Sequence, residues 1–214
     1  LIDAVNVFGN GYMLPRGTLR EPISHIDRAD VCLLTKVDQA TDASRSYIKK
    51  IVRETNDRAL LVESIHQPRC FVEISDWSDH LASEGIDTSQ MKGKRVMAVS
   101  AIGNPASFEQ TLSGLGTVVI ESLRFPDHHD YTVGEMLDVA GQAAVLGAEA
   151  VVITEKDAVK VPPETQEQIG RQLNYHIPIY VLSVEVTFRD GEKPLIDLIA
   201  EDLEKKVKKE GVAS

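Results

Sequence analysis

The segment FPDHHDYT, residues 125–132, combines residue types that can transfer protons or hold a metal ion. His128 and His129 are adjacent and lie between Asp127 and Asp130. A histidine near its ordinary pKa can accept a proton from an alcohol, and Asp and His are also ligands of divalent metals. The segment alone leaves three interpretations open: an acid–base site, a metal site or a polar structural turn. On the acid–base interpretation, Asp127, His128 and His129 are the candidate catalytic residues.

Two further polar loops follow apolar runs in the second half of the chain. SAIGNP places Gly103 and Asn104 directly before a predicted helix, where backbone amides could hold an anion or a polar substrate. TEKDAVK places Glu155, Lys156 and Asp157 after another apolar run. Its alternating charges suit a phosphate or carboxylate contact, and a loop that is ion-paired internally is the structural alternative.

The first half contains two candidate binding segments. TKVD, with Thr35, Lys36 and Asp38, matches a variant of the base-recognition loop of some nucleotide-binding proteins, although a surface turn would look the same. FGNGYMLPRGTLREP, residues 8–22, is a loop constrained by glycine and proline. It contains Asn10 and Gly11, and its arginines at positions 16 and 20 could bind phosphate through two hydrogen bonds each.

The elements that must position these loops alternate between strands and helices. Apolar runs predict strands over 94–103, 117–122, 149–154 and 177–188, and helical spacing predicts helices over 104–116, 132–147, 162–173 and about 193–209. Thr132 and Glu135 form a capping-box pattern at the start of the second helix. Strands that alternate with helices predict parallel pairing and an α/β fold. Because ligands bind at the carboxyl ends of parallel strands, we expect the three polar loops to gather at one sheet edge.

The first half is less regular. We expect strands at the first residues, over 28–38, and in two pieces within ALLVESIHQP and CFVEISDW, with a helix over 43–55. These elements predict two α/β/α layered units with mostly parallel sheets: residues 1–81, a linker at 82–94, and a second domain at 95–190. A C-terminal helix within 191–214 could pack back on the first domain.

Composition narrows the class of protein. The 214 residues carry a net charge of −10 at a pI near 5.1, which does not suggest a nucleic-acid-binding protein. Cys32 and Cys70 lie in apolar runs and are expected to be buried thiols. No run approaches the length of a membrane span, and we expect no signal peptide. We expect a cytoplasmic protein, or one peripheral to a membrane.

Taken in their order along the chain, these motifs resemble those of a known protein family. FGNG, LP and LREP, then TKVD, AIGNP, PDHHDYT and TEKDAVK together resemble the tetraacyldisaccharide 4′-kinase family of lipid A biosynthesis, from about residue 2 to residue 161. Arg16 and Thr18 depart from the family, which usually has Ala and Pro there, and Ala101 stands where Gly is usual.

The resemblance implies a phosphate-loop NTPase domain joined to a second α/β domain, with the active site in the cleft between them. It implies transfer of the ATP γ-phosphate, with Mg²⁺, to the 4′-hydroxyl of tetraacyldisaccharide 1-phosphate. The implied location is peripheral, at the cytoplasmic face of the bacterial inner membrane. One histidine of the DHH segment, His128 or His129, would partner an aspartate from the N-terminal part, and Arg20 would lie near phosphate and substrate.

The phosphate-binding loop of such kinases is missing from the printed sequence. No G-x-x-x-x-G-K-[ST] run occurs in the 214 residues, and no Lys is followed by Ser or Thr. We therefore expect a nucleotide-binding part truncated at its N-terminus, and no kinase activity from this chain alone. Two alternatives stay open: a DHH-type metal-dependent phosphoesterase, and a non-catalytic binding module derived from the kinase.

Overall fold

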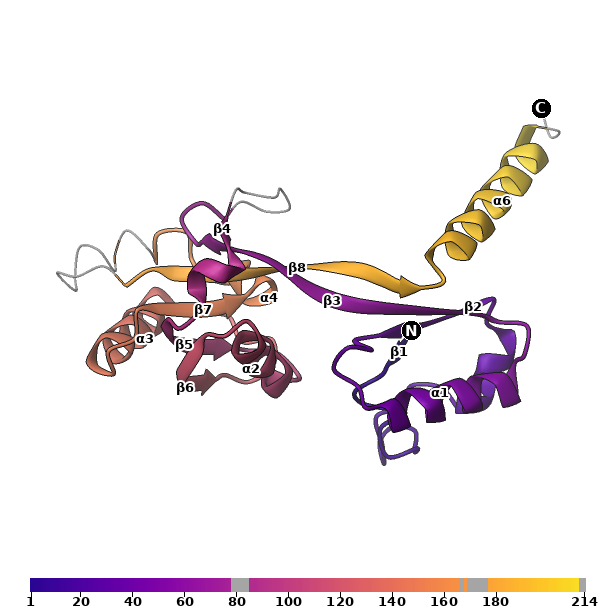
Figure 1. Ribbon diagram of the computed structural model, residues 1–214, viewed down its shortest axis with the longest axis horizontal. Coiled ribbons are helices and arrows are strands. Elements are labelled where there is room, and N and C mark those ends of the chain that lie inside the picture. Colours follow the sequence, from indigo (N-terminus) through magenta and orange to yellow (C-terminus); the bar gives the residue numbers. More distant parts are fainter. Residues whose placement is uncertain (78–84, 166–167, 169–176, 212–214) are drawn as a thin grey trace. The chain divides into compact units, whose positions relative to one another are not determined.

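The computed structural model describes residues 1–77, 85–165, 168 and 177–211 (Figure 1). The chain divides into two compact units, one formed by Leu1–Gln67 with Val186–Ser214 and the other by Pro68–Glu185. Residues 82–84 of the predicted linker and most of the predicted helix 162–173 lie outside the described residues. The predicted domain limits at 81 and 95 stay predictions.

The first unit is built on a parallel arrangement of β1 (Ile2–Asp3), β2 (Val31–Thr35) and the first part of β3 (Leu60–Glu73). Helix α1 (Asp42–Thr55) begins at Thr41, whose side chain accepts a hydrogen bond from the Ser44 amide. The buried core of this unit consists of Ala4, Cys32, Leu34, Val37, Ile48, Val52 and Ala59.

A short 3-10 helix, η1 (Ile23–Arg28), and helix α6 (Glu192–Gly211) complete the first unit. Asn56, at the end of α1, fixes η1 because its side-chain amide donates to the carbonyls of Ile26, Asp27 and Ala29 at 2.9–3.1 Å. Its carbonyl accepts from the amide of Ala59. One buried polar side chain thus joins the 3-10 helix, α1 and the entry to β3.

The second unit is a parallel sheet with the order β8-β7-β5-β6. Its elements are the later part of β3, β4 (Ile86–Asp87), η2 (Thr88–Met91), β5 (Arg95–Ser100), α2 (Pro105–Gly114), β6 (Val118–Arg124), α3 (Val133–Val145), β7 (Ala150–Thr154), α4 (Glu155–Ala158) and β8 (Ile179–Asp190). The short strand β4 pairs with β3 in the antiparallel direction.

Both faces of this sheet are buried, because successive residues of its central strands point to opposite sides. Met97 and Val99 of β5 belong to a core that includes Met136 and Val139 of α3. Val96 and Ala98 of β5 belong to a second core that includes Phe108 and Leu112 of α2. A helix therefore covers each face, and the predicted α/β/α layering with mostly parallel strands is confirmed.

The predicted capping box is confirmed, and a second cap is found at Asn104. Thr132 caps α3 and its hydroxyl accepts from the Glu135 amide, while the Glu135 carboxylate accepts from the Thr132 amide, which is a complete capping box. Asn104 caps α2 by accepting from the Ser107 amide at 3.2 Å.

Two differences from the sequence-based expectation concern the region around Pro68 and the TEKDAVK loop. The two strands expected around Pro68 form one, β3, because the fixed φ of proline is compatible with an extended chain. The TEKDAVK loop begins with a short helical turn, α4, capped by the Thr154 side chain. Strands β3 and β8 each contain residues of both units. Cys32 and Cys70 are free and buried, as predicted.

Candidate functional site

Three loops of the second unit meet where β5, β6 and β7 end. We call residues 101–104, 125–131 and 154–157 the three-loop cluster. The Phe125 amide donates to the Ser100 carbonyl at 2.9 Å, and the His128 amide donates to the Ala101 carbonyl at 3.2 Å. The Ala101 amide donates to the Asp157 carboxylate at 2.9 Å. The predicted gathering of these loops at one sheet edge is therefore seen directly.

Asp157 holds the cluster together from inside. It is fully buried, and its carboxylate accepts hydrogen bonds from the hydroxyls of Tyr131 (3.1 Å) and Thr154 (2.6 Å) as well as from Ala101. Burial raises the pKa of Tyr131 strongly, and the negative charge of Asp157 raises it further, so this phenol stays protonated as a donor. Asp157 was predicted to bind substrate or phosphate, and the structure surrounds it with partners from all three loops.

His129 is fixed by its neighbours. Its Nε2 lies 3.1 Å from Glu135 Oε1, and its ring stacks on Phe125 with centroids 4.7 Å apart. The side chain is 25% exposed. Hydrogen bonds from the Thr132 amide and hydroxyl lower the pKa of Glu135, and His129 lowers it further, despite an opposing effect of burial. The capping box of α3 therefore also anchors this histidine.

His128 is presented to solvent. Its side chain is 86% exposed, and its backbone has φ of +65°, a conformation that non-glycine residues adopt rarely. Its Nε2 lies 3.8 Å from Asp127 Oδ2, and that carboxylate lies 3.6 Å from the position that a Cβ on Gly103 would occupy. Asp127, His128 and Gly103 thus lie together on the exposed side of the cluster, and His128 is the histidine that a ligand can reach.

The other predicted residues of this unit have different surroundings. The side chain of Asn104 caps α2, and Glu155 accepts from the Ser183 hydroxyl at 2.9 Å. Lys156 is exposed and makes no ion pair within the described part of the chain. The amide of Ala101 points to Asp157, so the predicted anion cradle of AIGNP is partly used by the protein itself.

In the first unit, the TKVD turn is held to β1 by an ion pair. Lys36 has φ of +56° and its Nζ lies 2.7 Å from Asp3 Oδ2. Burial raises the pKa of Asp3, but the bonds from Lys36 and from the amides of Val5 and Asn6 together outweigh it, and the net pKa is lowered. Thr35 ends β2, and Asp38 lies exposed in the following turn.

The loop of residues 8–22 is ordered by its own hydrogen bonds. The Asn10 side chain donates to the Arg16 carbonyl at 3.1 Å and accepts from the Tyr12 amide at 3.2 Å. Gly11 has φ of +75°, which favours glycine. Arg20 is exposed, and among the described residues its guanidinium has no ion-pair partner. It could therefore bind an anion.

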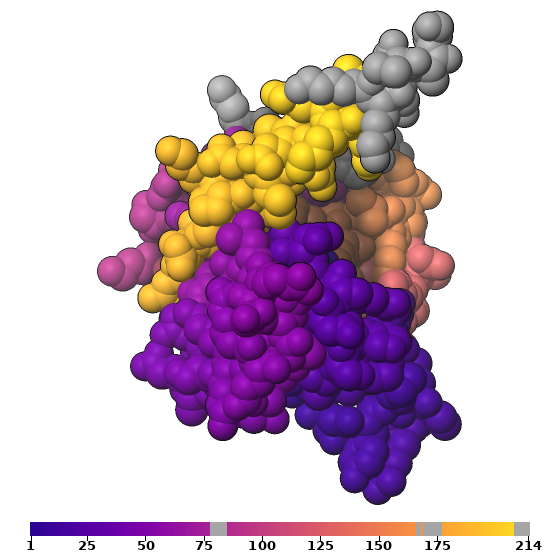
Figure 2. Space-filling view, turned by 90° about the vertical axis from the view of Figure 1, so that its right-hand side faces the viewer, coloured from indigo at the N-terminus to yellow at the C-terminus, as the bar shows by residue number. Residues whose placement is uncertain are grey.

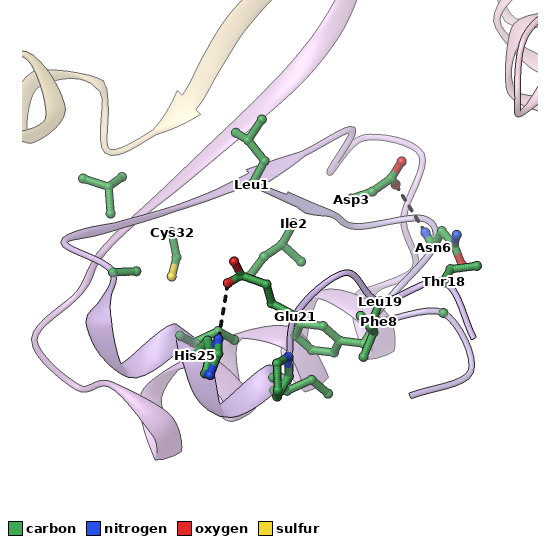
Figure 3. Close-up of a pocket in the computed structure, with 16 residues that line it drawn as sticks. Leu1, Ile2, Asp3, Asn6, Phe8, Thr18, Leu19, Glu21, His25 and Cys32 are labelled. Carbon is green, nitrogen blue, oxygen red and sulfur yellow. Dashed lines mark hydrogen bonds and ion pairs between the residues drawn. The ribbon is translucent and has the colours of Figure 1, made fainter. Parts of the chain in front are cut away.

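A pocket of about 400 Å³ lies beside this loop in the same unit (Figure 3). Figure 3 shows Ile2, Phe8 and Cys32 around it, and the pair formed by His25 Nδ1 and Glu21 Oε2, which are 3.4 Å apart. No local sequence pattern predicts this pocket, because its walls come from β1, the 8–22 loop, η1 and the start of β2.

The described residues offer neither a cluster of metal ligands nor a helix that could cross a membrane. In residues 1–77, 85–165 and 177–211, no three His, Cys, Asp or Glu side chains are grouped so that they could hold a metal ion. Over the same part of the chain, none of the helices has the length and hydropathy of a membrane-crossing segment.

Comparison with known proteins gives a consistent match. The family model described as tetraacyldisaccharide-1-P 4′-kinase matches residues 1–204. A protein of Anaeromyxobacter dehalogenans named tetraacyldisaccharide 4′-kinase is 38% identical over 173 residues, which are 81% of this chain and 44% of that protein. One of the same name from Elusimicrobium minutum is 36% identical over 206 residues, covering 95% of this chain and 50% of that protein.

A solved structure agrees with the fold. The crystal structure of LpxK from Aquifex aeolicus in complex with ATP superimposes with a TM-score of 0.50 at 24% sequence identity, covering 89% of this chain and 48% of that chain. The chain thus spans about half the length of the relatives that it matches.

Proposed function

Because the chain belongs to the tetraacyldisaccharide-1-P 4′-kinase family, we propose that it serves to transfer the γ-phosphate of ATP to the 4′-hydroxyl of tetraacyldisaccharide 1-phosphate. The observation that carries this proposal is the family match over residues 1–204. The three-loop cluster supports it, because it presents an ionisable side chain at the sheet edge where ligands of α/β proteins bind.

His128 is proposed as the residue that accepts the proton of the acceptor hydroxyl. As the new bond forms between the hydroxyl oxygen and the γ-phosphorus, the bond from that phosphorus to the β,γ-bridging oxygen breaks, ADP leaves, and the hydroxyl proton passes to the imidazole. The exposure of His128 allows this contact, and Asp127 at 3.8 Å can orient the ring. His129 is proposed as a positioning residue, because Glu135 and Phe125 already hold its ring.

The other predicted residues have proposed roles in charge neutralisation and positioning. Arg20 and Lys156 are exposed cations suited to phosphate, and Asn10, Gly11, Gly103, Asn104 and Glu155 shape the loops that carry or flank them. Asp157 is assigned to holding the cluster, since its carboxylate is buried.

We propose that the TKVD turn contacts the base of ATP through Thr35, Lys36 and Asp38, and that the Asp3–Lys36 ion pair fixes the turn.

Mg²⁺ would neutralise charge on the ATP phosphates during transfer. The described residues offer no group of three acidic or histidine side chains that could hold it. We therefore assign the ion no ligand in this chain. Because the acceptor is a lipid, the proposal includes a peripheral position at the cytoplasmic face of the inner membrane. It includes no nucleic-acid partner.

A chimera tests the proposal. In the Anaeromyxobacter dehalogenans relative, the matched segment is replaced by residues 1–204 of this chain, and transfer from ATP to tetraacyldisaccharide 1-phosphate is measured. We expect transfer, and a loss of about 100-fold or more in kcat for His128→Ala, the usual contribution of a positioned acid–base group. His129→Ala should lower kcat less and lower the melting temperature, because it removes the stacking partner of Phe125.

Asp130→Ala, an exposed carboxylate next to His129 in the sequence, is the matched control and should keep full activity. A folded His128→Ala chimera with unchanged kcat would remove His128 from the proposed role. A folded chimera that binds the acceptor without transferring phosphate would favour the non-catalytic binding module. Release of inorganic phosphate that depends on added Mn²⁺ would favour the phosphoesterase.

A further inference from the structure

Three successive apolar side chains are exposed in the middle of the 8–22 loop. Tyr12, Met13 and Leu14 have 47%, 45% and 62% of their surface accessible. Single exposed apolar residues are common, but three in a row on one loop offer apolar surface that a partner can cover. We call Tyr12, Met13 and Leu14 the apolar tip. In Figure 1 an indigo loop extends below α1, and Figure 2 shows indigo atoms projecting at the lower edge of the view.

The backbone holds the apolar tip in a fixed conformation. The Leu14 amide donates to the Leu19 carbonyl at 2.9 Å, and the Leu19 amide donates to the Tyr12 carbonyl at 3.2 Å. At Gly17 a Cβ would lie only 2.0 Å from the Tyr12 carbonyl oxygen, so only glycine fits there. A loop that is bonded across its base does not collapse to bury these side chains.

The charge around the apolar tip is positive. Residues 4–20 contain Arg16 and Arg20 and no acidic residue, although the whole chain carries −10. The Arg16 guanidinium lies 3.8 Å from the centre of the Tyr12 ring, a cation–π contact. An aromatic ring beside a cation, next to two aliphatic side chains, matches the chemistry of the boundary between lipid headgroups and acyl chains.

We propose that the apolar tip inserts into the interfacial region of an anionic lipid bilayer, where Arg16 binds headgroup phosphates. Tyr12 would lie at the headgroup level, while Met13 and Leu14 enter the acyl region. The choice of a lipid partner rests on the proposed function, but the exposure, the rigidity and the charge of the loop do not depend on it.

A second exposed apolar surface in the same unit provides the contrast. Ile196, Ile199, Leu203 and Val207 of α6 are 50–69% exposed, and their spacing places them on one helix face. The charged residues of α6 are Glu192, Asp197, Glu201, Asp202, Glu204 and Glu210 against Lys193, Lys205, Lys206, Lys208 and Lys209. With six acidic residues and five lysines, this helix has no excess of cations that an anionic bilayer would attract.

Binding to vesicles without nucleotide tests the inference. The full chain is sedimented with vesicles of phosphatidylcholine mixed with phosphatidylglycerol, and with phosphatidylcholine alone. We expect binding to the anionic vesicles, a loss of about tenfold or more in Met13→Ser/Leu14→Ser, and a loss with added salt. The matched control Ile199→Ser/Leu203→Ser removes an equal number of exposed apolar side chains from α6 and should bind like the parent.

A reporter at the apolar tip gives a second measurement. In Tyr12→Trp the new indole should shift its fluorescence to shorter wavelength on anionic vesicles, compared with the parent, which contains one Trp. Circular dichroism confirms that each variant is folded. The inference is overturned if the folded parent does not bind anionic vesicles, or if the tip variant binds them as well as the parent does. It is also overturned if only the α6 variant loses vesicle binding. Tip-dependent self-association without lipid would overturn it too, in favour of a second copy as partner.

These outcomes are separable from the proposed function. Vesicle binding needs no phosphate transfer, so a chimera that is active but does not bind vesicles overturns only the lipid contact. Vesicle binding without transfer contradicts only the kinase proposal.

Discussion

At the scale of single residues, Asp157 decides whether the three loops of the second unit stay together. It is buried and accepts from one amide and two hydroxyls that come from three different loops. Removing its carboxylate leaves these donors without a partner in a buried region. We predict that Asp157→Ala lowers the free energy of unfolding by about 3 kcal/mol, since each unsatisfied buried group costs roughly 1–3 kcal/mol.

Denaturant unfolding followed by circular dichroism measures this loss. Asp157→Asn keeps one acceptor oxygen and should lose less, while Asp130→Ala changes an exposed carboxylate in the same cluster and should be close to neutral. If Asp157→Ala unfolds like the parent but abolishes phosphate transfer in the chimera, Asp157 contacts the substrate and the positioning role is wrong.

At the scale of elements, most of the second unit follows from local signals. Thr132 and Glu135 predict the start of α3, Pro105 predicts the start of α2, and the Val- and Ile-rich runs predict parallel strands. The long strand β3 was not predicted, because Pro68 reads as a break when only local preferences are considered. Its extension depends on pairing with strands distant in sequence, which local patterns do not contain.

For the candidate site, the sequence predicted which loops lie together but not how each side chain is oriented. Ligands bind at the carboxyl ends of parallel strands, and this rule correctly predicted that the loops of Gly103, His128 and Asp157 lie together. It could not distinguish the exposed His128 from the fixed His129, because that difference arises from Phe125 and Glu135 on either side of the second ring. Nor could it show that Asp157 faces inward, since burial depends on packing between loops rather than on residue type.

The capping box of α3 predicts a pH effect at the element scale. The pKa of Glu135 is lowered below its ordinary value of 4.5, first by the Thr132 amide and hydroxyl and then by His129. A lowered folded-state pKa means that the carboxylate stabilises the fold above pH 4.5 and that this stabilisation is lost as pH falls through the lower folded-state pKa.

Comparison with Glu135→Gln measures this contribution. We predict that the parent is more stable than Glu135→Gln above pH 4.5 and that the difference disappears at lower pH. Glu185→Gln, an exposed change on β8, is the matched control and should show no such pH-dependent difference. A difference between parent and Glu135→Gln that stays constant across this range would mean that hydrogen bonding, and not the carboxylate charge, supplies the effect.

At the scale of the whole molecule, the printed sequence contains candidate residues for the acceptor side of phosphate transfer but no phosphate-binding loop for ATP. The 214 residues supply exposed cations and the acid–base candidate His128, but they contain no G-x-x-x-x-G-K-[ST] run. In kinases of this class that loop holds the β- and γ-phosphates through its backbone amides and its lysine. Without it the γ-phosphate is not held in line with the acceptor hydroxyl, and positioning is the main source of rate in phosphoryl transfer.

We therefore predict that the chain of 214 residues, purified alone, transfers no measurable phosphate from ATP, whereas the chimera with the Anaeromyxobacter dehalogenans relative does. Both are assayed with the same acceptor and Mg²⁺, and ATP binding is measured separately by calorimetry. The His128→Ala chimera is the control that ties activity to residues of this chain. If the isolated chain transfers phosphate and His128→Ala abolishes that transfer, the 214 residues bind the ATP phosphates without a G-x-x-x-x-G-K-[ST] loop. Arg20 and Lys156 would then be the first cations to replace.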